Sequence, residues 1–311
     1  MPIRPADHGI FASSGGGVTG AAYIAGGREA SVVATVDKFA FPDDSRSTLG
    51  TGLATATRYM GGASNGAVAA YFAGGYQTSQ VATVNKLAFS DDGLSTLGTG
   101  LSIARYQLAG AANSGTAAYF AGGGWPKKTT VDKFAFSDDG RTTLSTGLSF
   151  ANYTLSGAAN SGTAAYFAGG ITSSGNVDEV DKFAFSDDGR TTLTTGLSST
   201  RQSIAGAANS GTAAYFAGGY GSGRLDTVDK FAFSDDGRST LGTGLSAATD
   251  LLSGAADSGV AAYFAGGYDG SATVTTVDKF AFSDDSRSTL GTGLSAARYE
   301  LTAAANSSAL A

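Results

Sequence analysis

The stretch AAYFAGGGWPKKTTVDKFAFSDDGRTTLSTGLS, residues 117–149, decides the fold, because it recurs along the chain. Its AAYFAGG part has its Tyr at 23, 71, 119, 166, 215 and 263, and the first copy reads AAYIAGG. Its VDKFAF part has its Val at 36, 84, 131, 180, 228 and 277, and the second copy reads VNKLAF. The Val residues are 47 to 49 positions apart, so six similar units cover nearly the whole chain. A repeat of this length indicates a repeat architecture.

Each unit divides into four short strands. AAYFAGG is rich in aromatic and small residues, and TVDKFAF alternates apolar and polar side chains. SDDGR is a turn sequence, RTTL begins a Thr-rich strand, and LAGAANSG supplies a fourth strand of small residues with its own turn. Helical periodicity is missing from the units. The pattern therefore predicts an all-β, six-bladed β-propeller with four antiparallel strands per blade.

The small residues and the two chain ends predict how the ring is arranged. Ala and Gly crowd LAGAA (108–112), which suits the innermost strand, because six inner strands converge on a narrow axis. The chain starts with the second strand of a unit, near 20–27, and ends with the inner-strand sequence RYELTAAANSS (298–308). We expect the C-terminal strand to complete the first blade and leave no open edge. Residues 18–311 then form a single propeller domain, preceded by an N-terminal arm at 1–17.

A pair of aspartates recurs in the turn between the third and fourth strands of every unit. The pairs are Asp43-Asp44, Asp91-Asp92, Asp138-Asp139, Asp187-Asp188, Asp235-Asp236 and Asp284-Asp285. Six equal pairs are typical of turn residues that cap backbone N–H groups, whereas acid–base catalysis needs one asymmetric pair. Gly follows four of the pairs, and Ser45 and Ser286 follow the others. We expect a left-handed backbone at this position, strained at the two Ser residues. The spacing does not match the calcium loop DxDxDG, and weak calcium binding stays open.

The unit resembles the kelch repeat. The Gly pair that ends the second strand, as in Gly122-Gly123, matches the kelch pattern, as do Arg105, Arg201 and Arg298 before inner strands. The resemblance covers about residues 18–308 and implies a propeller with its ligand on the face of the b–c and d–a loops, where a to d denote the strands from the axis outward. One departure is that Leu stands where kelch has an aromatic residue on the fourth strand: Leu49, Leu97, Leu144, Leu193, Leu241 and Leu290. The chain is thus a divergent, kelch-like member, and fold alone does not fix its function.

Composition excludes several kinds of chemistry. The net charge of −6, with pI about 4.7, argues against nucleic acid as a partner. The chain has no Cys, and its one His, His8, lies in the expected arm, so no imidazole or thiolate metal site and no cofactor are predicted. No apolar run is long enough for a membrane span or a signal peptide. We expect a soluble protein without a membrane partner, cytoplasmic or virion-associated.

The units differ mainly in two kinds of connection. The a–b turns (AANSGT) and the c–d turns (SDDGR) hardly vary, whereas the b–c loops and d–a links vary freely. Strand direction alternates across a blade, so both variable connections are expected on one face of the disc. Loops on a rigid scaffold are where recognition usually resides. The alternative is that these loops vary because the fold places no constraint on their sequence. The candidate ligand-binding residues on this face are Trp125, Lys127, Tyr220, Tyr268, Arg105, Tyr106, Arg201 and Arg298.

Aromatic rings and arginines on one face predict a non-catalytic binding module for a protein or a glycan. The three arginines have an equally good structural interpretation, as groups that bond backbone carbonyls of adjacent blades. Trp125 has no counterpart in the other units and is the clearest anchor. One alternative function is a structural component of a larger assembly, such as a virion or tail appendage, so the chain is a monomeric ring or part of an assembly. The other is a carboxylate enzyme that uses variable-face residues: Asp178, Glu179, Asp226, Asp250 and Glu300.

Overall fold

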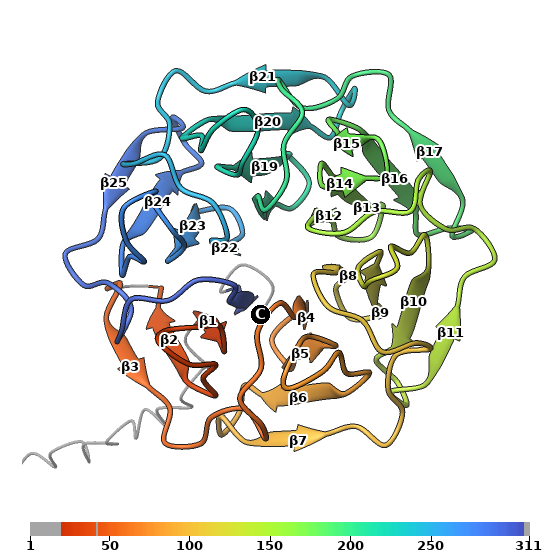
Figure 1. Ribbon diagram of the computed structural model, residues 1–311, viewed down its shortest axis with the longest axis horizontal. Helices are drawn as coiled ribbons and strands as arrows, with labels where there is room; N and C mark the ends of the chain where they lie inside the picture. The colour runs from red at the N-terminus through yellow and green to blue at the C-terminus, as the bar shows by residue number, and fades with distance from the viewer. Residues whose placement is uncertain (1–19, 42, 308–311) are drawn as a thin grey trace, which may run out of the picture.

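The chain folds into a ring of six four-stranded antiparallel sheets (Figure 1). The structure, a computed structural model, describes residues 20–41 and 43–307. The six-bladed all-β propeller expected from the repeat is confirmed. The proposed arm at 1–17, with His8, lies outside the described residues, and the domain boundary stays a prediction.

Every blade has the same order of strands from the axis outward. Blade 1 is β26 (Thr302–Asn306), β1 (Ala21–Ala25), β2 (Val36–Ala40) and β3 (Arg46–Thr48); blade 2 is β4 (Gly61–Asn65), β5 (Ala69–Ala73), β6 (Val84–Ala88) and β7 (Leu94–Thr96). Blade 3 is β8 (Ala109–Asn113), β9 (Ala117–Ala121), β10 (Val131–Ala135) and β11 (Arg141–Thr143); blade 4 is β12 (Ser156–Asn160), β13 (Ala164–Ala168), β16 (Val180–Ala184) and β17 (Arg190–Thr192). Blade 5 is β18 (Ala205–Asn209), β19 (Ala213–Ala217), β20 (Val228–Ala232) and β21 (Arg238–Thr240); blade 6 is β22 (Ser253–Asp257), β23 (Ala261–Ala265), β24 (Val277–Ala281) and β25 (Arg287–Thr289). A small hairpin, β14 (Ile171–Thr172) and β15 (Gly175–Asn176), interrupts the b–c loop of blade 4.

The C-terminal strand closes the ring. β26 pairs antiparallel with β1, with Tyr23 opposite Ala304, so the first blade takes its inner strand from the far end of the chain. The expected closure is confirmed for the described part of that strand. The edge of β1 that faces the axis is thus covered by β26 and is not left open.

The inner strands pack so closely that glycine is required among them. A Cβ atom added to Gly110 would lie 2.1 Å from the carbonyl oxygen of Gly62 in the neighbouring blade. A Cβ added to Gly157 would meet the carbonyl oxygen of Gly110 in the same way, at 2.2 Å. The small residues of LAGAA therefore hold the blades together around the axis, as the sequence indicated.

The apolar core lies between blades rather than within them. The buried Tyr of each b strand packs against the Phe that follows the c strand of the next blade, as Tyr23 does on Phe89, with ring centroids 5.1 Å apart. The last pair, Tyr263 and Phe41 at 5.2 Å, joins blade 6 to blade 1. The burial of aromatic area between blades is the main stabilising contribution to the ring.

The expected geometry of the Asp-Asp turns is wrong in one respect. The left-handed residue is the second Asp, as at Asp44 (φ 55°) and Asp285 (φ 57°), whereas Ser45 and Ser286 do not have positive φ. The first Asp caps the turn as expected: the Asp284 carboxylate accepts a 3.0 Å hydrogen bond from the Ser286 N–H. The second Asp instead binds the preceding blade, and this long-range contact selects the strained conformation. Asp tolerates that conformation better than most residues.

Candidate functional site

The two variable connections meet on one face of the disc, as the sequence predicted. Arg58 of a d–a link and Tyr76 of a b–c loop form a backbone bridge, with Tyr76 N–H donating to Arg58 O at 2.8 Å. Gln202 and Tyr220 form a similar pair elsewhere on the ring. All the residues at these junctions encircle the axis, and we call them the collar: Arg28, Arg58, Tyr76, Tyr106, Gly124, Tyr153, Ile171, Gln202, Tyr220, Asp250, Tyr268 and Tyr299.

Inside the collar lies a ring of six residues with left-handed backbone. Their φ angles are between 56° and 61°, although none of them is Gly. Each N–H donates to the carbonyl oxygen of the preceding member at 2.8 to 3.0 Å, which gives a closed cycle of hydrogen bonds. The members are Tyr59, Gln107, Thr154, Ser203, Leu251 and Glu300. The strained backbone persists because the cycle and the blades fix it, and such strain clusters at functional sites.

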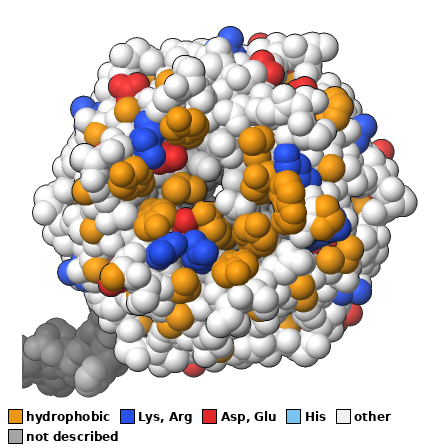
Figure 2. Space-filling model, in the orientation of Figure 1, with side chains coloured by type: hydrophobic (Ala, Val, Ile, Leu, Met, Phe, Trp, Pro, Cys, Tyr) orange, Lys and Arg blue, Asp and Glu red, His pale blue; other side chains and the backbone are white. Residues whose placement is uncertain are grey.

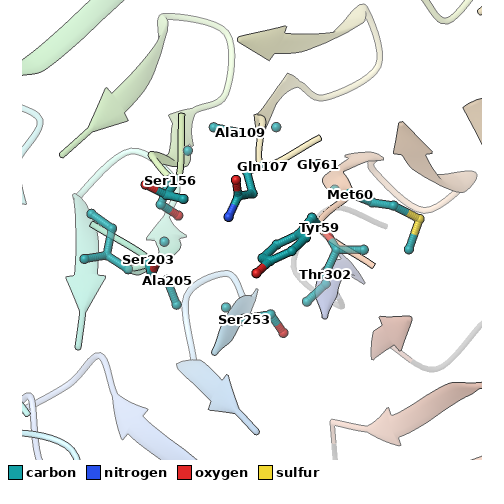
Figure 3. A pocket seen from close by; sticks show the side chains of 18 of the residues that line it. Tyr59, Met60, Gly61, Gln107, Ala109, Ser156, Ser203, Ala205, Ser253 and Thr302 are labelled. Carbon is teal, nitrogen blue, oxygen red and sulfur yellow. The ribbon is translucent and has the colours of Figure 1, made fainter. Parts of the chain in front are cut away.

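The ring surrounds the mouth of an axial cavity of about 120 Å³ (Figure 3). Tyr59 and Gln107 extend into the space between the inner strands in that view. Glu300, only 5% exposed, accepts hydrogen bonds from the Tyr59 hydroxyl at 2.5 Å and from Arg58 Nη1 at 2.6 Å. Burial, together with the Glu300 charge, raises the pKa of Tyr59, which keeps its hydroxyl a donor. The cavity is too small for more than a few water-sized groups.

Two arginines of this face, Arg58 and Arg224, lie against aromatic rings of the collar and the inner ring. Figure 2 shows apolar and basic side chains gathered around the central hollow. Arg58 lies 5.1 Å from the ring centroids of both Tyr59 and Tyr76, and Arg224 lies 4.4 Å from that of Tyr268. Such contacts hold long cationic side chains against the aromatic faces.

Two carboxylates of this face, expected as candidates for catalysis, are neutralised by neighbouring arginines. Asp250 forms a 2.9 Å ion pair with Arg224, and Glu300 pairs with Arg58. Burial raises the pKa of Asp250, and the bond from Arg224 opposes that rise. Both carboxylates are therefore paired with arginines of the same face.

The three arginines among the candidate residues are part of the scaffold. Arg105, Arg201 and Arg298 are fully buried. Nη2 of Arg105, on the link that follows blade 2, donates to Phe120 O at 2.9 Å and lies 3.0 Å from Asp132 Oδ2, both in blade 3. Burial lowers the pKa of Arg105, and the Asp132 charge opposes that shift. The burial favours the structural interpretation: the Arg105 N–H donates to Val81 O of blade 2, while its guanidinium bonds a carbonyl of the adjacent blade 3. A role of these arginines in ligand contact stays a prediction.

The remaining five candidates lie on the variable face but in separate places. Trp125 is 66% exposed and Tyr220 is 38% exposed. Tyr220 and Tyr268 flank Arg224 over blades 5 and 6, whereas Tyr106 packs with Tyr76 at 5.5 Å over blades 2 and 3. The side chain of Lys127 is held in place within the molecule, because its Nζ donates to Thr172 O and lies 5.2 Å from the centroid of the Tyr153 ring. The face therefore offers several contact regions rather than a single site.

A groove between blades 3 and 4 lies on this face. Its volume is about 650 Å³, and Trp125, Phe150 and Glu179 line it with seven neighbours. Sequence reasoning did not single out Phe150, which is 52% exposed, and named Glu179 only as an alternative catalytic carboxylate. Comparison of the units could have identified both, because Glu179 stands where the other five units have Thr and Phe150 where they have Thr, Ile, Ser or Ala.

No protein-family model matches the chain, and the search of curated proteins finds no match. Among residues 20–41 and 43–307, no group of three or more His, Cys, Asp or Glu side chains is placed to hold a metal ion. The same part of the chain contains no helix long and apolar enough to cross a membrane.

Proposed function

We propose that this protein is a non-catalytic recognition module that binds a protein partner through the collar face. The observation that carries the proposal is the distribution of variation. The scaffold contacts repeat in nearly every blade, whereas each of the two collar positions holds Tyr in three units and a different residue type in each of the other three. β-Propellers in general serve protein-binding roles, and a rigid disc with variable loops suits that task.

The chemistry of the collar supports a protein ligand. Tyr, Trp and Arg are the residue types that dominate binding energy at protein interfaces. Trp125 and Tyr220 are exposed, and Arg58 and Arg224 are held in place by ring faces and ion pairs. Side chains already held in one conformation lose little entropy on binding. The face is therefore organised for recognition before a partner arrives.

We also propose that the repeat is kelch-like. The support is local: the Gly pair after each b strand has positive φ, as at Gly122 (67°) and Gly123 (87°), where the chain turns into the variable loop. The Leu in place of the kelch aromatic residue marks the divergence. This relationship agrees with ligand binding on the same face.

Photo-crosslinking from each face in turn tests the proposal. A benzophenone amino acid at Tyr220 reports on the collar face, and one at Val260, 49% exposed at an a–b turn, reports on the opposite face. In an extract of the producing cells, we expect discrete protein adducts from Tyr220 and none of the same mass from Val260. Adducts confined to Val260, or glycan without protein attached at Tyr220, would contradict the proposal.

A further inference from the structure

The groove between blades 3 and 4 is built by three separate segments of the chain. Trp125, Pro126 and Lys127 come from the b–c loop of blade 3, and Phe150 and Ala151 come from the link that follows that blade. The third wall is the b–c loop of blade 4, from Thr172 to Glu179, which contains the β14–β15 hairpin. The b–c loops of blades 1, 2, 5 and 6 also fold back on themselves, through single backbone bridges such as Arg28–Val32. What distinguishes this groove is its side chains, because Trp125, Phe150 and Glu179 each differ from the residue of every other unit.

The carboxylate of Glu179 is not needed by the blade. The corresponding residues of the other five units are all Thr: Thr35, Thr83, Thr130, Thr227 and Thr276. The backbone role of this position is the same in each unit: Gly169 N–H donates to Glu179 O at 3.0 Å, just as Gly218 N–H donates to Thr227 O at 2.9 Å. Only the side chain differs. The replacement of Thr by Glu therefore serves something other than the fold.

The side chain of Glu179 has no hydrogen-bond partner among the described residues, and its Oε2 is buried. Lys127, the cation that lines the groove, uses its Nζ on Thr172 O and on the face of Tyr153. A buried carboxylate oxygen without a donor is costly, and a cationic donor relieves that cost best.

The rest of the groove fits the stem of a long basic side chain. Trp125 and Phe150 present exposed rings, and Pro126, Ala151 and Val177 add apolar surface. Lys and Arg bury their methylene stems against such surface and place the charged head on a carboxylate or an aromatic face. A sugar would need a partner for each hydroxyl. The polar residues that line this groove are Lys127, Thr172, Ser173, Ser174 and Glu179, and the Lys127 ammonium already donates to the Thr172 carbonyl oxygen. The net charge of −6 also favours the approach of a basic partner.

We propose that this groove receives a Lys or Arg side chain of the protein partner, with Glu179 as its ion-pairing residue and Trp125 and Phe150 as its apolar walls. The inference rests on the proposed function and adds the chemistry of the residue recognised. It makes Glu179 the determinant of specificity in this part of the face.

The single Trp of the chain makes the groove directly observable. Trp125 lines the groove, so intrinsic fluorescence reports its occupancy. The probes are short acetylated, amidated peptides with a central Arg or Lys, and the same peptides with citrulline or norleucine. We expect a saturable fluorescence change with the basic peptides and affinity about tenfold lower for the neutral ones, as for loss of a hydrogen bond to a charged group.

Two matched substitutions assign the effect to Glu179. Glu179→Thr restores the residue of the other five units and should keep the fold while weakening the basic peptide about tenfold. Glu29→Gln removes a carboxylate from the b–c loop of blade 1 on the same face and should leave affinity unchanged. Equal binding of Arg and citrulline peptides, or unchanged binding by Glu179→Thr, would overturn the inference. A response to oligosaccharides but not to peptides would do the same. Collar-face adducts at Tyr220 combined with no peptide binding would reject this inference alone and leave the proposed function standing.

Discussion

The hydroxyl of Tyr263 donates a 2.8 Å hydrogen bond to the carboxylate of Asp44, which joins the last blade to the first across 219 residues of sequence. Lys279 Nζ lies 2.7 Å from the other oxygen of the same carboxylate. The same Tyr–Asp–Lys arrangement stands at each of the six boundaries between blades. The second Asp of each turn is thus a clamp that fastens its blade to the preceding one.

These clamps predict a loss of stability at alkaline pH. Burial, reinforced by the bond to Asp139, raises the pKa of Tyr71 to about 12, and burial also raises the pKa of the other five clamp tyrosines. The hydroxyl of an unfolded Tyr has its ordinary pKa of about 10. The unfolded chain therefore releases protons that the folded chain retains, so this stabilisation is complete below pH 10 and is lost as pH rises toward 12 and beyond. Each such group contributes up to about 1.4 kcal/mol per pH unit to the fall in the free energy of unfolding, between pH 10 and its folded-state pKa.

Urea denaturation between pH 8 and pH 11.5 measures this slope. Tyr263→Phe removes one titrating group, so its slope should be shallower by about 1.4 kcal/mol per pH unit. A free energy of unfolding that stays level up to pH 11 would contradict the assignment.

The turn geometry reverses the expected effect of replacing Ser286. A left-handed Ser would be relieved by Gly, but Ser286 is not left-handed, and Asp285 is. Ser286→Gly should therefore destabilise the protein by about 0.5 to 1 kcal/mol, because Gly gains entropy in the unfolded chain. Gly237→Ser, the reverse change in blade 5, should be neutral or stabilising. Thermal melts of the two variants test this, and stabilisation by Ser286→Gly would refute it.

The sequence was sufficient for features set by the repeat and insufficient for those set by contacts between units. The six blades, the inner strand of small residues and the closure by 302–306 all follow from the order of segments. The strained Asp44 does not, because Tyr263 and Lys279 of another unit select its conformation. The burial of Arg201 was also hidden, since its partner Asp229 lies 28 positions further along the chain. Glu179 was visible as a departure from Thr, but only the structure places it beside Phe150.

The buried ion pairs can be tested with replacements that the protein already contains. Arg201 Nη2 lies 2.9 Å from Asp229, which also accepts from the N–H and hydroxyl of Ser198. Blade 2 has Thr, Asn and Ala at these three positions, namely Thr57, Asn85 and Ala54. Arg201→Thr alone should cost about 3 kcal/mol, because it leaves Asp229 buried with one cation fewer. The triple replacement S198A, R201T and D229N should recover a large part of that loss.

Urea midpoints at constant m-value compare the single and triple variants. Equal stability of the two would show that the three positions act independently. A single variant as stable as the original protein would remove the ion pair from the scaffold.

Removal of the C-terminal strand should open the ring. Deletion of residues 299–311 removes β26 and Glu300, exposes the edge of β1 and uncovers the contact with β22 and β4. We expect the melting temperature to fall by more than about 10 °C, since a 1 kcal/mol loss alone shifts it by a few degrees. A synthetic peptide of residues 299–311 should restore part of the loss in a concentration-dependent way. A truncated chain that melts within a few degrees of the full one would contradict closure.

Trp125 gives the sharpest separation of binding from folding. It is 66% exposed, has no counterpart in other units, and contacts Tyr153 edge-on at 6.4 Å. Trp125→Ala removes no buried area that the blade needs, so the free energy of unfolding should change by less than about 0.5 kcal/mol. Loss of an aromatic anchor should weaken the affinity for a partner bound at the collar face by about tenfold or more.

Val260→Thr, which restores the residue of blades 3 to 5 on the opposite face, is the matched control and should leave affinity unchanged. Calorimetric melts and titration of the partner provide both measurements. Equal affinities of the Trp125→Ala and Val260→Thr proteins would place the interface elsewhere, and a large fall in melting temperature for Trp125→Ala would make the residue part of the scaffold.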